Sequence, residues 1–87
     1  ATVTVPGLAE AGIAVNASNG HVYVANSNGW GYYSNAVTII RADNTVAANR
    51  AGGDFSDPFG IAVDESTNTV YVGNRAANAI SVFADNY

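Results

Sequence analysis

Residues 12–26 read GIAVNASNGHVYVAN and residues 60–74 read GIAVDESTNTVYVGN, so one segment occurs twice in this chain of 87 residues. The two copies lie 48 residues apart and are identical at nine of their fifteen positions. Further along, residues 35–40 align with residues 78–83 at a separation of 43. The first copy therefore carries five extra residues, the difference between 48 and 43, within the segment SNGWGYYSN at 27–35. A constant internal period of this kind is the sequence signature of a repeat architecture.

Short apolar runs separated by turn residues predict β-strands, and no segment has helical periodicity. The predicted strands are residues 13–15, 21–25, 36–41, 45–49, 61–63, 69–73 and 79–84. The connections 16–20 and 64–68 are rich in Asn, Ser, Asp and Gly, which favour tight turns. A period near 43 built from such strands predicts an all-β fold of two four-stranded propeller blades.

The second copy resembles a known repeat family. Its segments PFGIAVD at 58–64, TNTVYVGN at 67–74 and NAISVF at 78–83 are similar to the YVTN-type propeller repeat, a relative of the NHL repeats. The first copy departs from that pattern in having Asn16 where the family favours Asp, and in its insertion. The resemblance covers nearly the whole chain and implies a propeller. It leaves the function open, because such propellers serve as surface proteins, as binding platforms and, less often, as enzymes.

The two ends of the repeat pattern predict self-assembly. Residues 83–87 match residues 41–45, which lead into the strand 45–49, so the second blade is expected to lack its fourth strand. The opening residues resemble a fourth strand without a blade. We therefore divide the chain into a donated strand and connection at 1–10, a first blade at 11–50 with the insertion 27–35, and an incomplete second blade at 51–87. The expected assembly residues are Thr2, Val3, Thr4 and Val5 of the donated strand, with Ile80 and Val82 of the strand that receives it.

Such a contact is heterologous, so copies joined head to tail close into a ring or continue as a fibre. Of the usual propeller sizes, a trimer with six blades is favoured over a tetramer with eight. Two blades alone would leave large apolar faces exposed, because propeller blades bury their faces against their neighbours. The alternative is that the sequence is a piece of a longer propeller, whose other blades cover those faces.

Composition excludes several classes of function. The net charge is −4, with three Arg and no Lys, which disfavours nucleic-acid binding and excludes Schiff-base chemistry. The absence of Cys excludes disulfides and thiolate ligands. No apolar run approaches the roughly 18 residues that a membrane-spanning helix needs, so membrane insertion is not expected. The eleven Asn and the absence of Lys and Cys are common among secreted microbial surface proteins, which predicts an extracellular or cell-surface location.

The insertion is the candidate ligand-binding site. Aromatic rings between glycines, together with amides, suit contact with a sugar ring or with another protein. The candidate residues are Trp30, Tyr32, Tyr33, Asn28 and Asn35. The alternative is that the aromatic side chains pack over the edge of the blade or between subunits.

The acidic and histidine side chains are given structural roles. Asp54 and Asp57 lie in a glycine-containing loop, but their spacing matches no calcium loop, so a solvated turn is favoured and no metal is expected. His21 is the sole histidine, and no nucleophile motif accompanies it, so no catalytic residue is assigned. Asp64 and Asp85 are expected to close Asx turns at the ends of strands.

Two recurring pairs are also expected to be structural. Asn26 and Asn74 end the second strand of each copy and are expected to make equivalent hydrogen bonds, whereas Tyr23 and Tyr71 are expected to pack between blades. The preferred function is therefore a self-assembling structural or interaction protein, without a cofactor and with copies of itself as partners. The alternative is a multivalent carbohydrate-binding propeller that uses the aromatic insertion. An enzyme is the third class, and no arrangement of residues supports it.

Overall fold

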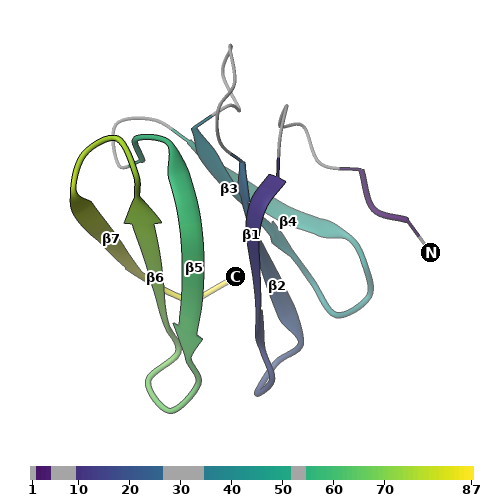
Figure 1. The fold of residues 1–87 in the computed structure, drawn as a ribbon. Helices are drawn as coiled ribbons and strands as arrows, with labels where there is room; N and C mark the ends of the chain where they lie inside the picture. The colour runs from purple at the N-terminus through teal and green to yellow at the C-terminus, as the bar shows by residue number, and fades with distance from the viewer. Residues whose placement is uncertain (1, 5–9, 27–34, 52–54) are drawn as a thin grey trace.

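The chain forms two antiparallel β-sheets in a computed structural model that describes residues 2–4, 10–26, 35–51 and 55–87. The first sheet contains β1 (Glu10–Asn16), β2 (His21–Asn26), β3 (Ala36–Ile40) and β4 (Val46–Ala51) in that order. The second contains β5 (Pro58–Asp64), β6 (Thr69–Asn74) and β7 (Ala79–Ala84). No helix occurs among these residues. Figure 1 shows the sheets side by side, with β5 next to β1. The prediction of an all-β chain is confirmed.

All seven predicted strands are present, and each sheet is a meander whose consecutive strands pair. The turns adopt the backbone that their residues favour. Gly20 and Asn68, which occupy equivalent positions of the repeat, both have a positive φ, of 77° and 51°. Gly and Asn tolerate this left-handed conformation better than other residues do. Tight reversals are therefore possible just before β2 and β6.

The Asx turn expected at Asp64 is present, and Asn16 forms the same turn at the equivalent position. The side-chain oxygen Oδ1 of Asn16 accepts a hydrogen bond from the Ser18 backbone N–H at 3.1 Å. Oδ1 of Asp64 accepts from the Ser66 N–H at 3.0 Å in the same way. The hydroxyl of Ser66 also donates to Asp64, and it is the main cause that lowers the pKa of this carboxyl. Asn and Asp are thus equivalent at this position, because both supply the acceptor that the turn needs.

Asn26 and Asn74 make matching bonds to the neighbouring strand, as expected from their recurrence. Nδ2 of Asn26 donates to the Thr38 hydroxyl at 2.9 Å, and Nδ2 of Asn74 donates to the Ser81 hydroxyl at 2.7 Å. Thr38 and Ser81 are themselves equivalent at the separation of 43. These bonds pair the buried Nδ2 donors at the ends of β2 and β6, where an unpaired donor would be costly.

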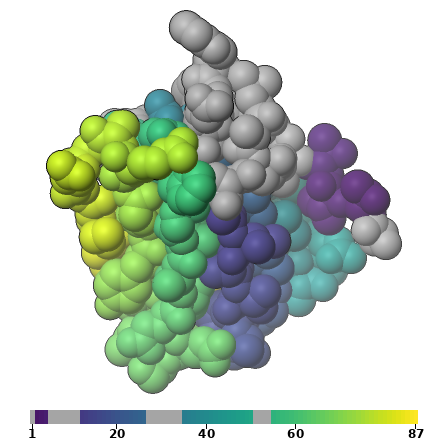
Figure 2. Space-filling model, viewed as in Figure 1, coloured from purple at the N-terminus to yellow at the C-terminus, as the bar shows by residue number. Residues whose placement is uncertain are grey.

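The core lies between the sheets. Its buried side chains are Tyr23, Val37, Ile39, Phe55, Val70, Val72 and Phe83. The Phe83 ring is central, with ring centroids 6.0 Å from Tyr23 and 6.2 Å from Phe55. In the second sheet, burial alternates along most of each strand, so one face packs on the first sheet and the other is exposed. Such alternation is expected of a sheet that is covered on one face only. Figure 2 shows the two halves in close contact.

The sheets approach closely where β1 meets β5. A Cβ atom at Gly12 would overlap the carbonyl oxygen of Phe59. Phe59 is the extra residue of a bulge, because the register of β5 against β6 shifts between Pro58 and Gly60. A bulge redirects the backbone locally. Glycine at position 12 therefore allows the two backbones to touch.

Candidate functional site

The exposed face of the second sheet is an uncovered apolar surface in the described part of the chain. Tyr71 of β6 is 42% exposed, and Ile80 and Val82 of β7 are 63% and 58% exposed. Ala62 and Gly60 of β5 belong to the same face, since they alternate with the inward-facing positions of that strand. We call these five residues the outer face of the second sheet. A contiguous exposed apolar surface of this kind is typical of a site that binds another protein or a ligand.

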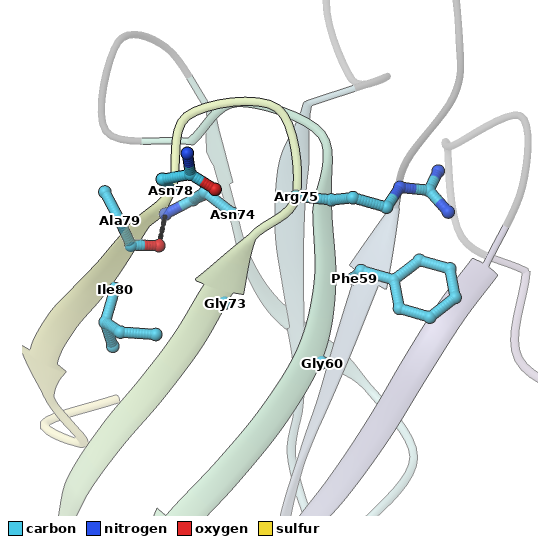
Figure 3. Close-up of a pocket in the computed structure, with 8 residues that line it drawn as sticks. All are labelled: Phe59, Gly60, Gly73, Asn74, Arg75, Asn78, Ala79 and Ile80. Atoms are coloured by element: carbon cyan, nitrogen blue, oxygen red, sulfur yellow. Dashed lines mark hydrogen bonds between the residues drawn. The ribbon is translucent and has the colours of Figure 1, made fainter.

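The upper part of this outer face is hollowed (Figure 3). A shallow pocket of about 280 Å³ is lined by Phe59, Gly60, Gly73, Asn74, Arg75, Asn78, Ala79 and Ile80. Arg75 extends over the Phe59 ring, with its guanidinium carbon 4.3 Å from the ring centroid. Its Nε lies 2.9 Å from Oδ2 of Asp57. The Arg75 side chain is about half exposed, so this ion pair adds little stability and mainly orients the guanidinium group.

Ile80 and Val82, two of the expected assembly residues, therefore lie on an exposed surface. The other four expected assembly residues belong to the N-terminal segment. Thr2 and Thr4 are exposed, Val3 is half-buried, and residues 2–4 belong to neither sheet, whereas Val5 lies outside the described residues. Within the part of the chain that is described, the outer edge of β7 has no strand beside it.

Asn35 is the one described residue of the aromatic insertion. Its side-chain oxygen Oδ1 accepts a hydrogen bond from the Asp57 backbone N–H at 3.0 Å. This bond joins the start of β3 to the connection before β5, so the amide oxygen has a structural role. The other four candidate ligand-binding residues, Asn28, Trp30, Tyr32 and Tyr33, lie outside the described residues, as does Asp54 of the acidic loop.

A polar cluster joins the sheets at the opposite end of the strands from Asn35, and its centre is Asp85. Oδ2 of Asp85 accepts hydrogen bonds from Nδ2 of Asn16 at 2.7 Å and from Nδ2 of Asn19 at 2.9 Å. Oδ1 lies 2.8 Å from Nδ1 of His21. Asn16 also donates to Oδ1 of Asn68 at 3.0 Å. Three residues of the first sheet and its β1–β2 turn thus bind one buried carboxylate that follows β7 of the second sheet.

The expectation that Asp85 closes an Asx turn is wrong. The chain turns toward the first sheet after β7, which brings the Asp85 carboxylate beneath β1 and β2. Tyr87 follows the same course, since its hydroxyl accepts a hydrogen bond from Nη1 of Arg50 in β4 at 3.2 Å. Its ring meets Phe83 edge to face. Asp is a residue that commonly forms an Asx turn. Here, however, its carboxylate accepts hydrogen bonds from the side-chain amides of Asn16 and Asn19, which are distant in the sequence.

The surroundings of Asp85 favour its charged form. Burial of its side chain, which is 0% exposed, raises the pKa of Asp85, but the nearby Tyr23 hydroxyl and the hydrogen bonds from Asn19, His21 and Asn16 outweigh burial and hold it well below the usual range. Burial and this carboxylate together raise the pKa of Tyr23 above its ordinary value. No hydrogen bond of good geometry reaches the buried Tyr23 hydroxyl among the described residues.

The His21–Asp85 pair resembles the orienting half of a catalytic triad, but no nucleophile completes it among the described residues. The hydroxyl of Ser18, the nearest candidate in sequence, donates to Oδ1 of Asn16 at 2.7 Å, and Oδ1 of Asn68 is a second acceptor at 3.1 Å. Its proton is thus directed away from His21. The described segments also contain no group of three or more His, Asp or Glu side chains able to hold a metal ion. The cluster is a junction between the sheets.

Comparison with known proteins adds no assignment, because no family model matches the chain and no curated protein matches it in sequence. Within the described ranges, no helix is long and apolar enough to cross a membrane. Sequence reasoning missed two features of the site, the Asp85 junction and the glycine contact between β1 and β5. A signal for the second was present, since Gly12 and Gly60 are identical positions of the repeat.

Proposed function

We propose that the chain is a self-assembling β-propeller repeat protein, in which each copy supplies two blades and joins the next copy head to tail. The first sheet would be a complete blade, and the second a blade completed by a strand from a neighbour. The assembly would serve as an extracellular structural or interaction protein. No catalytic step is part of this proposal.

One observation carries the proposal: the outer face of the second sheet repeats the face of the first sheet that is buried. Tyr71 is the repeat equivalent of Tyr23, which is fully buried between the sheets. Ile80 and Val82 are the equivalents of Val37 and Ile39, which are also fully buried. Because the two faces have similar side chains in the same register, they should pack against similar surfaces, and we call such a surface the complement of the face. The complement of the buried face lies within the chain, whereas that of the exposed face must come from another repeat.

The first sheet offers that complement on its own outer face. Ile13 and Val15 of β1 are 68% and 55% exposed. They are the equivalents of Ile61 and Val63, which pack on the core from β5. A second copy can therefore present its β1 to the outer face of the second sheet. Covering one such half-exposed Val or Ile side chain contributes about 1 kcal/mol, so several together favour association.

Strand addition would strengthen the same contact. The outer edge of β7 presents backbone N–H and C=O groups, and the described N-terminal residues, Thr2, Val3 and Thr4, pair with neither sheet. Adding these residues to β7 of a neighbour would supply main-chain hydrogen bonds, each with a net value of about 1 kcal/mol. An unpaired edge otherwise invites uncontrolled aggregation.

Native mass of the purified chain tests the proposal. We expect a defined multiple of 8.9 kDa, such as a trimer or tetramer, or a fibre. Ile80→Glu should reduce the assembly to the single chain, since it places a charge on the outer face. Ala77→Glu adds the same charge at an exposed turn and should leave the assembly unchanged. A wild-type chain that stays at 8.9 kDa up to millimolar concentration would refute self-assembly and favour blades of a longer polypeptide.

Deletion of residues 1–6 tests strand donation separately. The deleted chain should no longer form the wild-type particles, whereas Trp30→Ala should leave them intact. If the deletion leaves the particles unchanged, strand donation is wrong, and docking through the sheet faces alone remains. Finding the native protein mainly inside intact cells would contradict the extracellular assignment.

A further inference from the structure

We propose that a second copy docks on the second sheet in one register, with its residue 11 carbonyl seated over Gly60. This inference rests on the proposed head-to-tail assembly and specifies the contact by which it occurs. It requires the contact between copies to repeat the backbone contact that Phe59 makes with Gly12 inside one chain.

The contact inside the chain is the template. Gly12 of β1 lies against the Phe59 carbonyl of β5 so closely that a Cβ would overlap the oxygen. The same Cβ would stand 3.6 Å from the Cα of Gly60. The neighbour at Gly12 is thus backbone, which cannot move aside as a flexible side chain could. Glycine is required at position 12 by the second sheet and not by a special backbone angle.

Phe59, the residue that supplies this carbonyl, has an equivalent in the first sheet. The register of β1 against β2 shifts between Glu10 and Gly12, and that of β5 against β6 shifts between Pro58 and Gly60. Both copies of the repeat therefore contain a bulge at the same position, with residue 11 and Phe59 as the extra residues. The matching bulges imply that the residue 11 carbonyl is directed to the outer face of the first sheet, as the Phe59 carbonyl is directed to Gly12. That is the face on which Ile13 and Val15 are exposed.

Gly12, the residue against which this carbonyl packs, also has an equivalent. Gly60 occupies the position of Gly12 in the second copy, but a Cβ at Gly60 would meet no atom of the described residues within 4 Å. The backbone angle φ of Gly60 is not positive. Neither its backbone conformation nor its packing inside the chain calls for glycine. The open space at Gly60, at the edge of the pocket in Figure 3, is the shape that a second copy's backbone would fill.

The polar half of the junction inside the chain is not repeated on the outer face. The positions equivalent to Asn16 and His21 are Asp64 and Thr69, and the position equivalent to Asn68 is Gly20. A second copy therefore cannot rebuild the hydrogen bonds of the Asp85 cluster. The contact between copies relies on apolar side chains and on the close backbone contact at Gly60. Because apolar side chains can pack in several registers, the backbone contact at Gly60 largely determines which register forms.

Gly60→Ala and Gly12→Ala form a matched pair of variants that tests the register. Gly60→Ala should keep the wild-type circular dichroism spectrum, because the added methyl group has free space within the chain. Its self-association, measured by sedimentation velocity over a range of concentrations, should be about tenfold to hundredfold weaker, as expected for overpacking at a close contact. Gly12→Ala should instead lower the stability of the single chain.

Each other outcome overturns the register. Wild-type self-association of Gly60→Ala, together with dissociation by Ile80→Glu, would show that the face is used in another register. Loss of the β-sheet signal in Gly60→Ala would show that the space at position 60 is already needed within the chain. A wild-type chain that never associates would refute both this inference and the proposed function.

Discussion

Removal of the Asp85 carboxylate should strongly destabilise the folded chain. Asp85→Ala deletes the acceptor for Asn16, Asn19 and His21, whose donors lie 2.7 to 2.9 Å away. A hydrogen bond to a charged group contributes about 1.5–3 kcal/mol, but Asn16 keeps its second bond, to Asn68. We therefore expect a total loss of about 3–5 kcal/mol, the range for breaking a buried pair. A chain of this size has a stability of roughly 4–13 kcal/mol.

Urea unfolding at pH 7, followed by circular dichroism, measures this loss. With a denaturant slope of about 1 kcal/mol per M, the midpoint should fall by about 3 M or more. The variant is best made in the Ile80→Glu background, because assembly would otherwise add a concentration-dependent term. Asp43→Ala is the matched control, since Asp43 is an exposed carboxylate that bonds only within its own turn, to Thr45. Equal effects of the two substitutions would refute the role of Asp85 as the centre of the junction.

Two further predictions concern acid and the aromatic core. Because the pKa of Asp85 is depressed in the folded state, its contribution is complete above the unfolded value of about 3.9 and is lost as the pH falls toward the lower folded value. The urea midpoint should therefore decrease below about pH 4, and Asp85→Ala should flatten this decrease; an unchanged slope would contradict the assignment. Phe83→Ala should cost about 3–5 kcal/mol, since its ring packs on Tyr23 and Phe55. Phe59→Ala, at a 45% exposed residue, should cost far less in the same urea-unfolding assay, and similar losses would contradict this placement of the core.

Local chemistry was enough to predict the strands and their turns. Alternating apolar residues and turn-forming Asn, Asp and Gly act over a few neighbours, so their outcome is visible in the chain itself. The repeat added information about pairs. Because Asn26 and Asn74 both end the second strand of their copy, equivalent hydrogen bonds could be expected before any contact was seen.

Asp85 shows where such reasoning fails. An Asp after a strand normally bonds to backbone N–H groups two residues further on, and the neighbouring sequence contains nothing against that prediction. Its actual partners lie 64 to 69 residues away. They become available only when the two sheets pack and exclude water from the carboxylate. Local pattern cannot rank a nearby donor against a distant one whose position depends on the fold.

The residue pattern is sufficient to predict that the chain is all-β, that it repeats, and which positions of the two copies are equivalent. Which of the two equivalent faces is buried becomes visible only when the sheets are packed together. Tyr23 and Tyr71 have the same neighbours along the chain, yet one is fully buried and the other is 42% exposed. Gly12 and Gly60 differ in the same way, since one touches a carbonyl and the other faces open space. The physical reason is that burial depends on what packs against a sheet, and a repeated sequence specifies the same face each time without specifying the neighbour that covers it.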